Sequence, residues 1–255
     1  MPSPFPTLSR RLLGLVATLA LVATLAAEQT QRDYNPSDVT AYAGLSLGEY
    51  TALHLGGAFS FLDGLKLVKA RGEYMQEAAV ATPSGMVAIM GADEAAVLKL
   101  CVDTAAGEVL VPANYNAPGQ IIVSGANAAC ERFAAAAETA GFKTVILKVA
   151  GAFHSPLMQR GADRMGAELD RVDLRMPLTT VYANVTASPH TSIAEVKKLL
   201  VEQIVSPVRW EQTMQKIVAA GEARFVELAP GRVLMGLLRK INRRLLVESL
   251  ATVAV

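Results

Sequence analysis

Apolar and polar positions change their spacing several times along the chain, and each spacing predicts an element. Residues 39–43 are a short apolar run that predicts a strand, and residues 49–53 after it are helix formers. Apolar side chains recur at helical spacing over residues 59–79, which predicts a long helix. Residues 81–85 are rich in residues that break helices and strands, so we expect a boundary between two parts of the chain there.

A second set of elements follows this boundary. The pattern predicts a strand, a helix, two strands, a helix and a strand at residues 86–90, 92–105, 108–113, 120–124, 126–140 and 143–149. The sequence Asn-Tyr-Asn-Ala-Pro-Gly at residues 114–119 is expected to be the loop between the two middle strands. This β-α-β-β-α-β order is that of the split ferredoxin-like unit.

Strands and helices alternate again beyond residue 151. We expect helices at 156–172, 193–204, 208–220 and 233–241, and strands at 179–183 and 225–228. Such alternation favours a mainly parallel sheet flanked by helices. The predicted fold class is therefore α/β, with a large domain formed by residues 1–84 and 151–255 and an inserted βαββαβ subdomain at residues 85–150.

Composition narrows the function classes. The chain has 255 residues and a formal net charge of +1, which fits one large domain with an insert and gives no broad basic surface for nucleic acid. Its two cysteines, Cys101 and Cys130, are too few for a disulfide scaffold or a four-ligand zinc site. A disordered chain, a coiled coil and a nucleic-acid-binding arm are excluded.

An uncharged run at residues 12–27 follows Arg10 and Arg11 and allows two interpretations. A basic pair before an apolar stretch is typical of a secretory signal. The run is shorter than the roughly 20 residues that a membrane-spanning helix needs, so the other interpretation is a helix buried beside the sheet.

A candidate nucleophile lies between the first predicted strand and its helix. Residues 44–48, Gly-Leu-Ser-Leu-Gly, match the G-x-S-x-G nucleophile elbow, in which a strained turn exposes Ser46 at the sheet edge. We expect that side chains at Gly44 and Gly48 would crowd this turn. The start of the following helix would direct main-chain N–H groups at a developing oxyanion. The alternative is a glycine–serine turn without chemistry.

The base is chosen from three histidines. His54 is two turns into the helix after the elbow, too local to reach back to Ser46, and His190 lies in a polar segment where we expect it to be solvated. His154 lies between a predicted strand and a helix, where α/β active sites gather, so elimination favours it as the base. No aspartate at a convincing strand end completes a triad, which leaves a backbone carbonyl or an amide to orient the imidazole.

One further candidate is Arg71, in the middle of the long predicted helix. A guanidinium matches both oxygens of a substrate carboxylate. The alternative is an arginine that is solvated or paired with a nearby glutamate.

Six ordered blocks together resemble the malonyl-CoA:acyl carrier protein transacylase family. They are the elbow at 44–50, an arginine segment at 71–76, the Asn-Tyr-Asn segment at 114–120, a histidine segment at 151–158, a glutamine segment at 203–210 and a turn at 227–234. The resemblance implies that Ser46 is the acylated nucleophile and His154 the base. It implies that Gln203 orients His154 through its main-chain carbonyl, in place of a carboxylate.

The resemblance also implies three substrate contacts and a reaction. Arg71 would bind the malonyl carboxylate, the N–H of Leu47 would form half of the oxyanion hole, and Phe153 would narrow the pocket against α-branched groups. The implied fold is a hydrolase-like α/β domain with a ferredoxin-like insert. The implied reaction moves malonyl from coenzyme A to the phosphopantetheine thiol of acyl carrier protein in fatty acid biosynthesis. It implies no metal or redox cofactor, no nucleic acid, no stable membrane association, and a cytoplasmic monomer.

Two departures from the family pattern change the expectations. Leu45 stands where the family usually has histidine. Residues 1–38 contain nothing like the family's N-terminal Gly-Gln-Gly loop, whose glutamine supplies the second oxyanion contact, so we expect slower turnover than in a full-length relative. This departure favours the buried-helix interpretation of residues 12–27. Two alternatives stay open: a serine hydrolase or thioesterase of the α/β-hydrolase type, and an inactive N-terminally truncated remnant.

Overall fold

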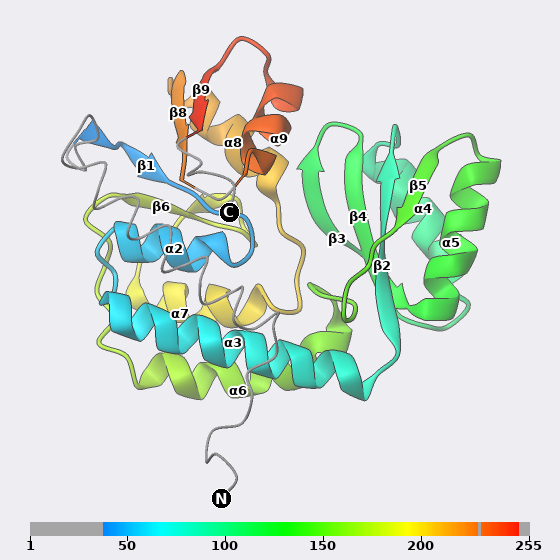
Figure 1. Ribbon diagram of the computed structural model, residues 1–255, viewed down its shortest axis with the longest axis horizontal. Helices are drawn as coiled ribbons and strands as arrows, with labels where there is room; N and C mark the ends of the chain where they lie inside the picture. The colour runs from blue at the N-terminus through cyan, green and yellow to red at the C-terminus, as the bar shows by residue number, and fades with distance from the viewer. Residues whose placement is uncertain (1–37, 229–230, 250–255) are drawn as a thin grey trace, which may run out of the picture.

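The computed structural model describes residues 38–228 and 231–249, and the apolar run at 12–27 lies outside them. A helix-covered body stands beside a four-stranded unit, with a small two-stranded region above the body in the view of Figure 1. The body contains β1 (Ala41–Tyr42), α2 (Gly48–Leu55), α3 (Phe61–Ala81), the 3₁₀ turn η2 (Pro156–Met158), α6 (Gln159–Asp170), β6 (Thr180–Ala183), β7 (Ser188–Pro189) and α7 (Ile193–Glu202).

The body sheet brings distant segments together at one edge. Strand β1 pairs in parallel with β6, with Ala41 opposite Thr180, and β6 pairs antiparallel with β7. The chain therefore leaves β1 and β6 at the same edge of the sheet, and the elbow follows β1 there.

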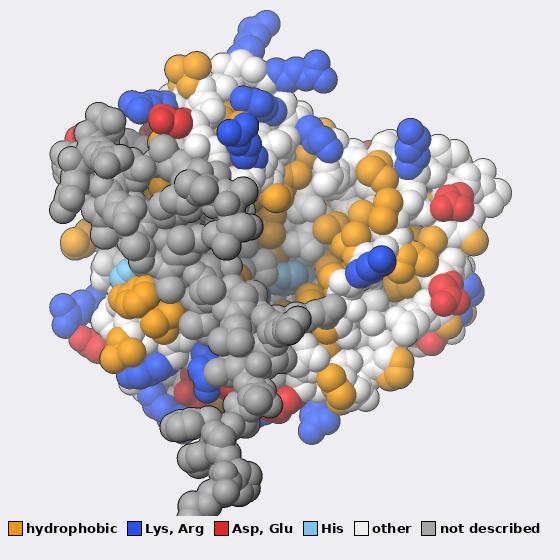
Figure 2. Space-filling model, viewed as in Figure 1, with side chains coloured by type: hydrophobic (Ala, Val, Ile, Leu, Met, Phe, Trp, Pro, Cys, Tyr) orange, Lys and Arg blue, Asp and Glu red, His pale blue; other side chains and the backbone are white. Residues whose placement is uncertain are grey.

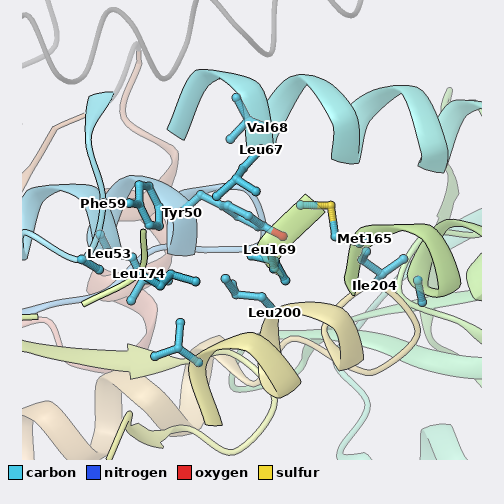
Figure 3. Close-up of a cluster of buried hydrophobic side chains, with 14 of the residues drawn as sticks. Tyr50, Leu53, Phe59, Leu67, Val68, Met165, Leu169, Leu174, Leu200 and Ile204 are labelled. Atoms are coloured by element: carbon cyan, nitrogen blue, oxygen red, sulfur yellow. The ribbon is translucent and has the colours of Figure 1, made fainter. Parts of the chain in front are cut away.

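Helices α2, α3, α6 and α7 bury a common apolar core, shown in Figure 3. Tyr50 and Leu53 on α2 meet Leu67 on α3, Leu169 on α6 and Leu200 on α7, each at most 1% exposed. The predicted helix at 59–79 is thus confirmed as α3, whose apolar positions supply one side of this core. Because helix α2 is packed here, the turn before it has a fixed place.

The four-stranded unit confirms the predicted element order. Its elements are β2 (Ser84–Met90), α4 (Glu94–Ala105), β3 (Leu110–Ala117), β4 (Gln120–Ala126), α5 (Asn127–Thr139) and β5 (Lys143–Ile146). All pairs are antiparallel, in the order β3-β4-β2-β5. Apolar residues from α4, α5 and the sheet form a separate core that includes Val97, Val87 and Phe133.

One expectation for this unit was wrong. Residues 114–117 are not a loop but the end of β3, and only Pro118 and Gly119 make the turn. The main-chain groups of β3 also bond to the body, because Tyr115 N–H donates to Val208 O (2.9 Å) and Val208 N–H donates to Ala113 O (2.9 Å). The polar asparagines suggested a loop, whereas Asn114, Tyr115 and Ala117 pair with residues 120–122 of β4 in a tight hairpin.

The remaining elements are α8 (Trp210–Ala219), β8 (Arg224–Glu227), α9 (Val233–Ile241) and β9 (Leu246–Ser249). Strand β9 was not predicted, and it pairs in parallel with β8. Helix α8 begins at Trp210 rather than at residue 208, since Val208 is engaged with β3. The helix expected from residue 156 starts as the 3₁₀ turn η2 before α6.

The surface is hollowed between the body and the four-stranded unit, and a patch coloured as histidine is visible in the hollow (Figure 2). Hydrophobic side chains gather on the face of the four-stranded unit beside it. Among the described residues, every helix is too short or too polar to cross a membrane.

Candidate active site

The turn between β1 and α2 holds Ser46 in a backbone conformation that residues other than glycine rarely adopt. Its φ angle is +54°, in the left-handed region. A Cβ at Gly44 would lie 2.0 Å from the carbonyl carbon of Gly48, so only glycine fits at Gly44. A Cβ at Gly48 would meet no atom within 4 Å, so the predicted crowding is wrong there. The strain at Ser46 is of the kind that active sites store.

His154 lies against this serine. Its Nε2 is 2.7 Å from Ser46 Oγ, and its Nδ1 is 2.7 Å from the main-chain oxygen of Gln203. Because a carbonyl oxygen only accepts, Nδ1 carries the proton and Nε2 is free to accept the serine O–H. His154 also has a left-handed φ of +59°. The structure thus brings together three residues that the sequence placed in one site.

Burial sets the charge of this imidazole. Loss of solvent, and then the positive charge of Arg71, lower the pKa of His154 to about 4. The ring is therefore neutral over the ordinary pH range, which is the form that can take a proton from a hydroxyl.

Arg71 is buried and points at the serine, so the solvated or glutamate-paired alternative is wrong. The Nη2 atom of Arg71 donates to Ser46 Oγ (3.0 Å) and to Gln203 Oε1 (3.0 Å). The guanidinium lies 5.7 Å from the ring centroid of Tyr50. Its buried Nε has no hydrogen-bond partner within the described part of the chain. Arg71 thus places a fixed cation beside the nucleophile.

Leu47 and Phe153 flank the reacting residues in sequence. Leu47 directly precedes α2, so its N–H is among the first donors of that helix and has no partner within the helix. Phe153 precedes His154, is half-buried against the body core, and accepts a hydrogen bond at its carbonyl oxygen from Ser124 Oγ (2.6 Å). That bond ties the histidine loop to β4 of the four-stranded unit.

Comparison with known proteins agrees with this geometry. Residues 16–253 match the acyl transferase domain family. The chain belongs to this family. The predicted α/β class with a hydrolase-like body and a ferredoxin-like insert is confirmed by its structural relatives.

Two relatives set the scale of the similarity. The malonyl CoA-acyl carrier protein transacylase of Bacillus subtilis (strain 168) is 44% identical over 206 residues, which are 80% of this chain and 65% of that protein. This chain thus spans slightly less than two thirds of the length of that relative. The solved malonyl CoA-acyl carrier protein transacylase of Coxiella burnetii has a TM-score of 0.92 at 33% identity, covering 98% of this chain and 78% of its own.

One solved structure contains a partner. It is described as a malonyl-transacylase, PlMCAT, in complex with AntF, a type II polyketide synthase acyl-carrier protein. It matches this chain with a TM-score of 0.88 at 31% identity, covering 94% of this chain and 77% of its own.

Asn184 also lies at this candidate site, although its sequence context did not lead us to predict it. It directly follows β6, and its Oδ1 accepts the main-chain N–H of Ser46 (2.6 Å) while its Nδ2 donates to Gly44 O (2.7 Å). The available signal was its position: it follows a predicted strand at the edge where sites gather in α/β sheets.

His190 corrects a further expectation. Its side chain is fully buried rather than solvated, and Nε2 lies 3.0 Å from Glu49 Oε1. Glu49, which follows the elbow glycine, is also fully buried and was missed. His54 is placed as expected, away from Ser46, with Nδ1 3.1 Å from Phe59 O. Histidine, cysteine and carboxylate side chains form no group of three suited to a metal ion within residues 38–228 and 231–249.

Proposed function

We propose that this acyl transferase domain moves a malonyl group from coenzyme A to the phosphopantetheine thiol of acyl carrier protein, through an ester on Ser46. The observation that carries the proposal is the position of Ser46 Oγ, which lies 2.7 Å from His154 Nε2 and 3.0 Å from Arg71 Nη2. A base and a fixed cation at one hydroxyl suit attack on a carbonyl whose acyl group carries a carboxylate. The names of the relatives supply the thioester and the carrier protein.

The first half-reaction acylates the serine. His154 Nε2 takes the Ser46 O–H proton as Oγ attacks the thioester carbonyl, and the N–H of Leu47 stabilises the oxyanion. Collapse of the tetrahedral intermediate breaks the carbon–sulfur bond. The departing coenzyme A sulfur takes the proton from the imidazolium, which leaves malonyl-Ser46 and a neutral His154.

The second half-reaction reverses these steps with another thiol. His154 takes the proton of the phosphopantetheine thiol, whose sulfur attacks the malonyl ester. Collapse then breaks the bond to Ser46 Oγ, which regains the proton from His154. Neither half-reaction changes an oxidation state, so the proposed chemistry needs no redox cofactor, and the proposed roles of His154 and Leu47 call for no metal ion.

Arg71 provides the proposed preference for malonyl. It is 4% exposed, and an ion pair with a substrate carboxylate in such a place is stronger than at a surface. The carboxylate would also supply an acceptor for a guanidinium that has an unpartnered Nε among the described residues. Phe153, next to the base, is proposed to limit the width of the acyl pocket.

Two further proposals concern the cellular compartment and the oligomeric state of the protein. Cys101 and Cys130 are free and buried, which suits a reducing compartment such as the cytoplasm. We also propose a monomer as the active unit, because His154, Arg71 and Asn184 already bond to Ser46 without a residue from a second copy.

The test is intact-mass measurement after incubation with malonyl-CoA, followed by addition of the phosphopantetheine-loaded carrier protein. We expect a malonyl adduct that the carrier protein removes and acquires. A Ser46→Ala variant should form no adduct. Release of free malonate with no malonyl on the carrier protein would contradict transfer and indicate a hydrolase, and an unmodified wild-type chain would indicate an inactive remnant.

A further inference from the structure

Behind the nucleophile and its base lies a second buried acid–histidine pair, Glu49 and His190. Both side chains are fully buried, and Glu49 Oε1 is 3.0 Å from His190 Nε2. The other oxygen, Oε2, accepts the main-chain N–H of Asn184 (2.9 Å) and the side-chain Nε2 of Gln203 (2.6 Å). Both carboxylate oxygens are therefore bonded, as burial of a charge requires.

This carboxylate decides which way the Gln203 amide points. A carboxylate only accepts, so the NH₂ of Gln203 must face Glu49. The amide oxygen must then face the opposite side, where it accepts from Arg71 Nη2 (3.0 Å). The reversed amide would place oxygen against the carboxylate and NH₂ against the guanidinium, so Glu49 selects the orientation that holds Arg71.

The same carboxylate supports both reacting groups. Gln203, which Glu49 holds, also donates Nε2 to Ser46 O (3.0 Å) and accepts His154 Nδ1 at its main-chain oxygen (2.7 Å). The main-chain N–H of Asn184 donates to Glu49, and the side-chain oxygen of Asn184 accepts the N–H of Ser46. One buried acid thus connects the ends of β6 and α7 to the elbow.

We propose that Glu49, held in place by His190, is a positioning residue for acyl transfer that fixes the Gln203 amide and, through it, Arg71 and the elbow. This inference rests on the proposed function for its substrate but concerns a residue that contacts neither acyl group nor thiol. The charged and titratable groups around the pair are Arg71 on α3, Tyr50 on α2 and, facing His190, Glu195 on α7. A carboxylate only accepts, so His190 donates to Glu49 from Nε2, while its Nδ1 has no hydrogen-bond partner among the described residues.

The test uses two variants of His190 and a matched control. His190→Leu removes the donor to Glu49, His190→Gln keeps an N–H near the position of Nε2, and His54→Leu makes the same change at a histidine of α2 outside the site. Transfer from malonyl-CoA and from acetyl-CoA is measured with thermal unfolding. We expect His190→Leu to lower kcat for malonyl transfer by about 10- to 100-fold, with a smaller loss for acetyl transfer. A shift of the Gln203 amide would displace Arg71 and the elbow, and a displacement of about 1 Å lowers the rate of a reaction by this order. His190→Gln should recover most of both, and His54→Leu should change neither.

A labelling measurement separates this inference from the proposed function. The rate at which a fluorophosphonate modifies Ser46 reports the elbow and the base without any malonyl. If the wild type is labelled but transfers no malonyl, the proposed function fails. The positioning role is then judged from labelling alone, and it predicts that Ser46 is labelled slowly in His190→Leu and at nearly the wild-type rate in His190→Gln. Should His190→Leu fail to fold, Glu49→Ala takes its place, because it removes the acceptor of both the Asn184 N–H and the Gln203 Nε2, and it should also label slowly. Equal labelling rates and equal malonyl-to-acetyl ratios in all folded variants, with only the unfolding temperature lowered, would overturn the proposal.

Discussion

The body and the four-stranded unit bury different kinds of side chains. The core of the four-stranded unit is apolar, with Val87, Ile89 and Phe133 fully buried between sheet and helices. The body has an apolar core as well, but beside it the body also buries Arg71 and Glu49, at 4% and 0% exposure. Burial of charge costs free energy unless every group is paired, so it is kept where chemistry needs it.

Backbone strain shows the same difference. In the body, both Ser46 and His154 have left-handed φ angles, and their side chains meet. In the four-stranded unit the left-handed residue Ala106 follows the last turn of α4, where such a conformation ends a helix. The comparison teaches that the body holds the strained and charged groups of the proposed chemistry, whereas the four-stranded unit supports them by packing. Variants in the two parts should therefore differ, from the largest effect on rate to the smallest.

The largest effect is expected from His154→Ala. Removal of a positioned general base should slow malonyl transfer by about 10²–10⁴. The measurement is the rate of acylation of Ser46 by malonyl-CoA in a single turnover. His54→Ala is the matched control, since His54 bonds to Phe59 O and not to the site. Equal rates in the two variants would mean that the base is elsewhere.

Arg71→Ala should follow, and it should discriminate between substrates. Loss of the charged partner of a buried carboxylate costs about 2–5 kcal/mol, or roughly 30- to several-thousand-fold in kcat/KM for malonyl-CoA. Acetyl-CoA has no carboxylate to lose, so its transfer should fall far less. The measurement is the malonyl-to-acetyl ratio of kcat/KM. A ratio that stays at the wild-type value would assign Arg71 to structure rather than to substrate binding.

The rate of Ser46 acylation should also depend on pH, with a smaller effect than that of the two substitutions. Burial and Arg71 lower the pKa of His154 to about 4, and the neutral ring is the active form. The rate of acylation should therefore hold as the pH falls and decline only near pH 4. Without the charge at Arg71, the pKa of His154 rises, so the decline should move to higher pH in Arg71→Ala. A decline in the wild type near pH 6.5 would show an exposed rather than a buried base.

Phe133→Ala should affect stability and leave the chemistry unchanged. Phe133 on α5 is fully buried in the core of the four-stranded unit, and such a truncation costs about 3–5 kcal/mol of unfolding free energy. The measurement is denaturant unfolding together with the acylation rate per folded molecule, with Phe133→Leu as the smaller change. A large loss of rate in molecules that remain folded would break the separation between the two parts.

The sequence could predict what depends on local pattern. The order of the βαββαβ unit followed from periodicity, because its strands and helices are bounded by turn residues, whereas the pairing of β2 with β4 and β5 has no such local signal. Gly44 and the strand–turn–helix order likewise predicted that Ser46 lies in a tight turn at the sheet edge, and the structure shows that only glycine fits at position 44.

Long-range pairing could not be read from the sequence. The main-chain bonds that join Ala113 and Tyr115 to Val208 cross more than ninety positions, and the burial of His190 depends on Glu49, 141 positions earlier. Both segments are locally polar and were predicted to be loops. A polar side chain gives the same local signal whether it faces solvent or a buried partner.

The central claim is that Ser46 is acylated while Arg71 holds the carboxylate of the same acyl group. The most direct measurement is a crystal structure of the protein after reaction with malonyl-CoA. The account predicts a malonyl ester on Ser46 Oγ, with its free carboxylate within hydrogen-bond distance of the Arg71 guanidinium, about 2.7–3.2 Å. A malonyl group on another residue, or an ester on Ser46 whose carboxylate points away from Arg71, would contradict it.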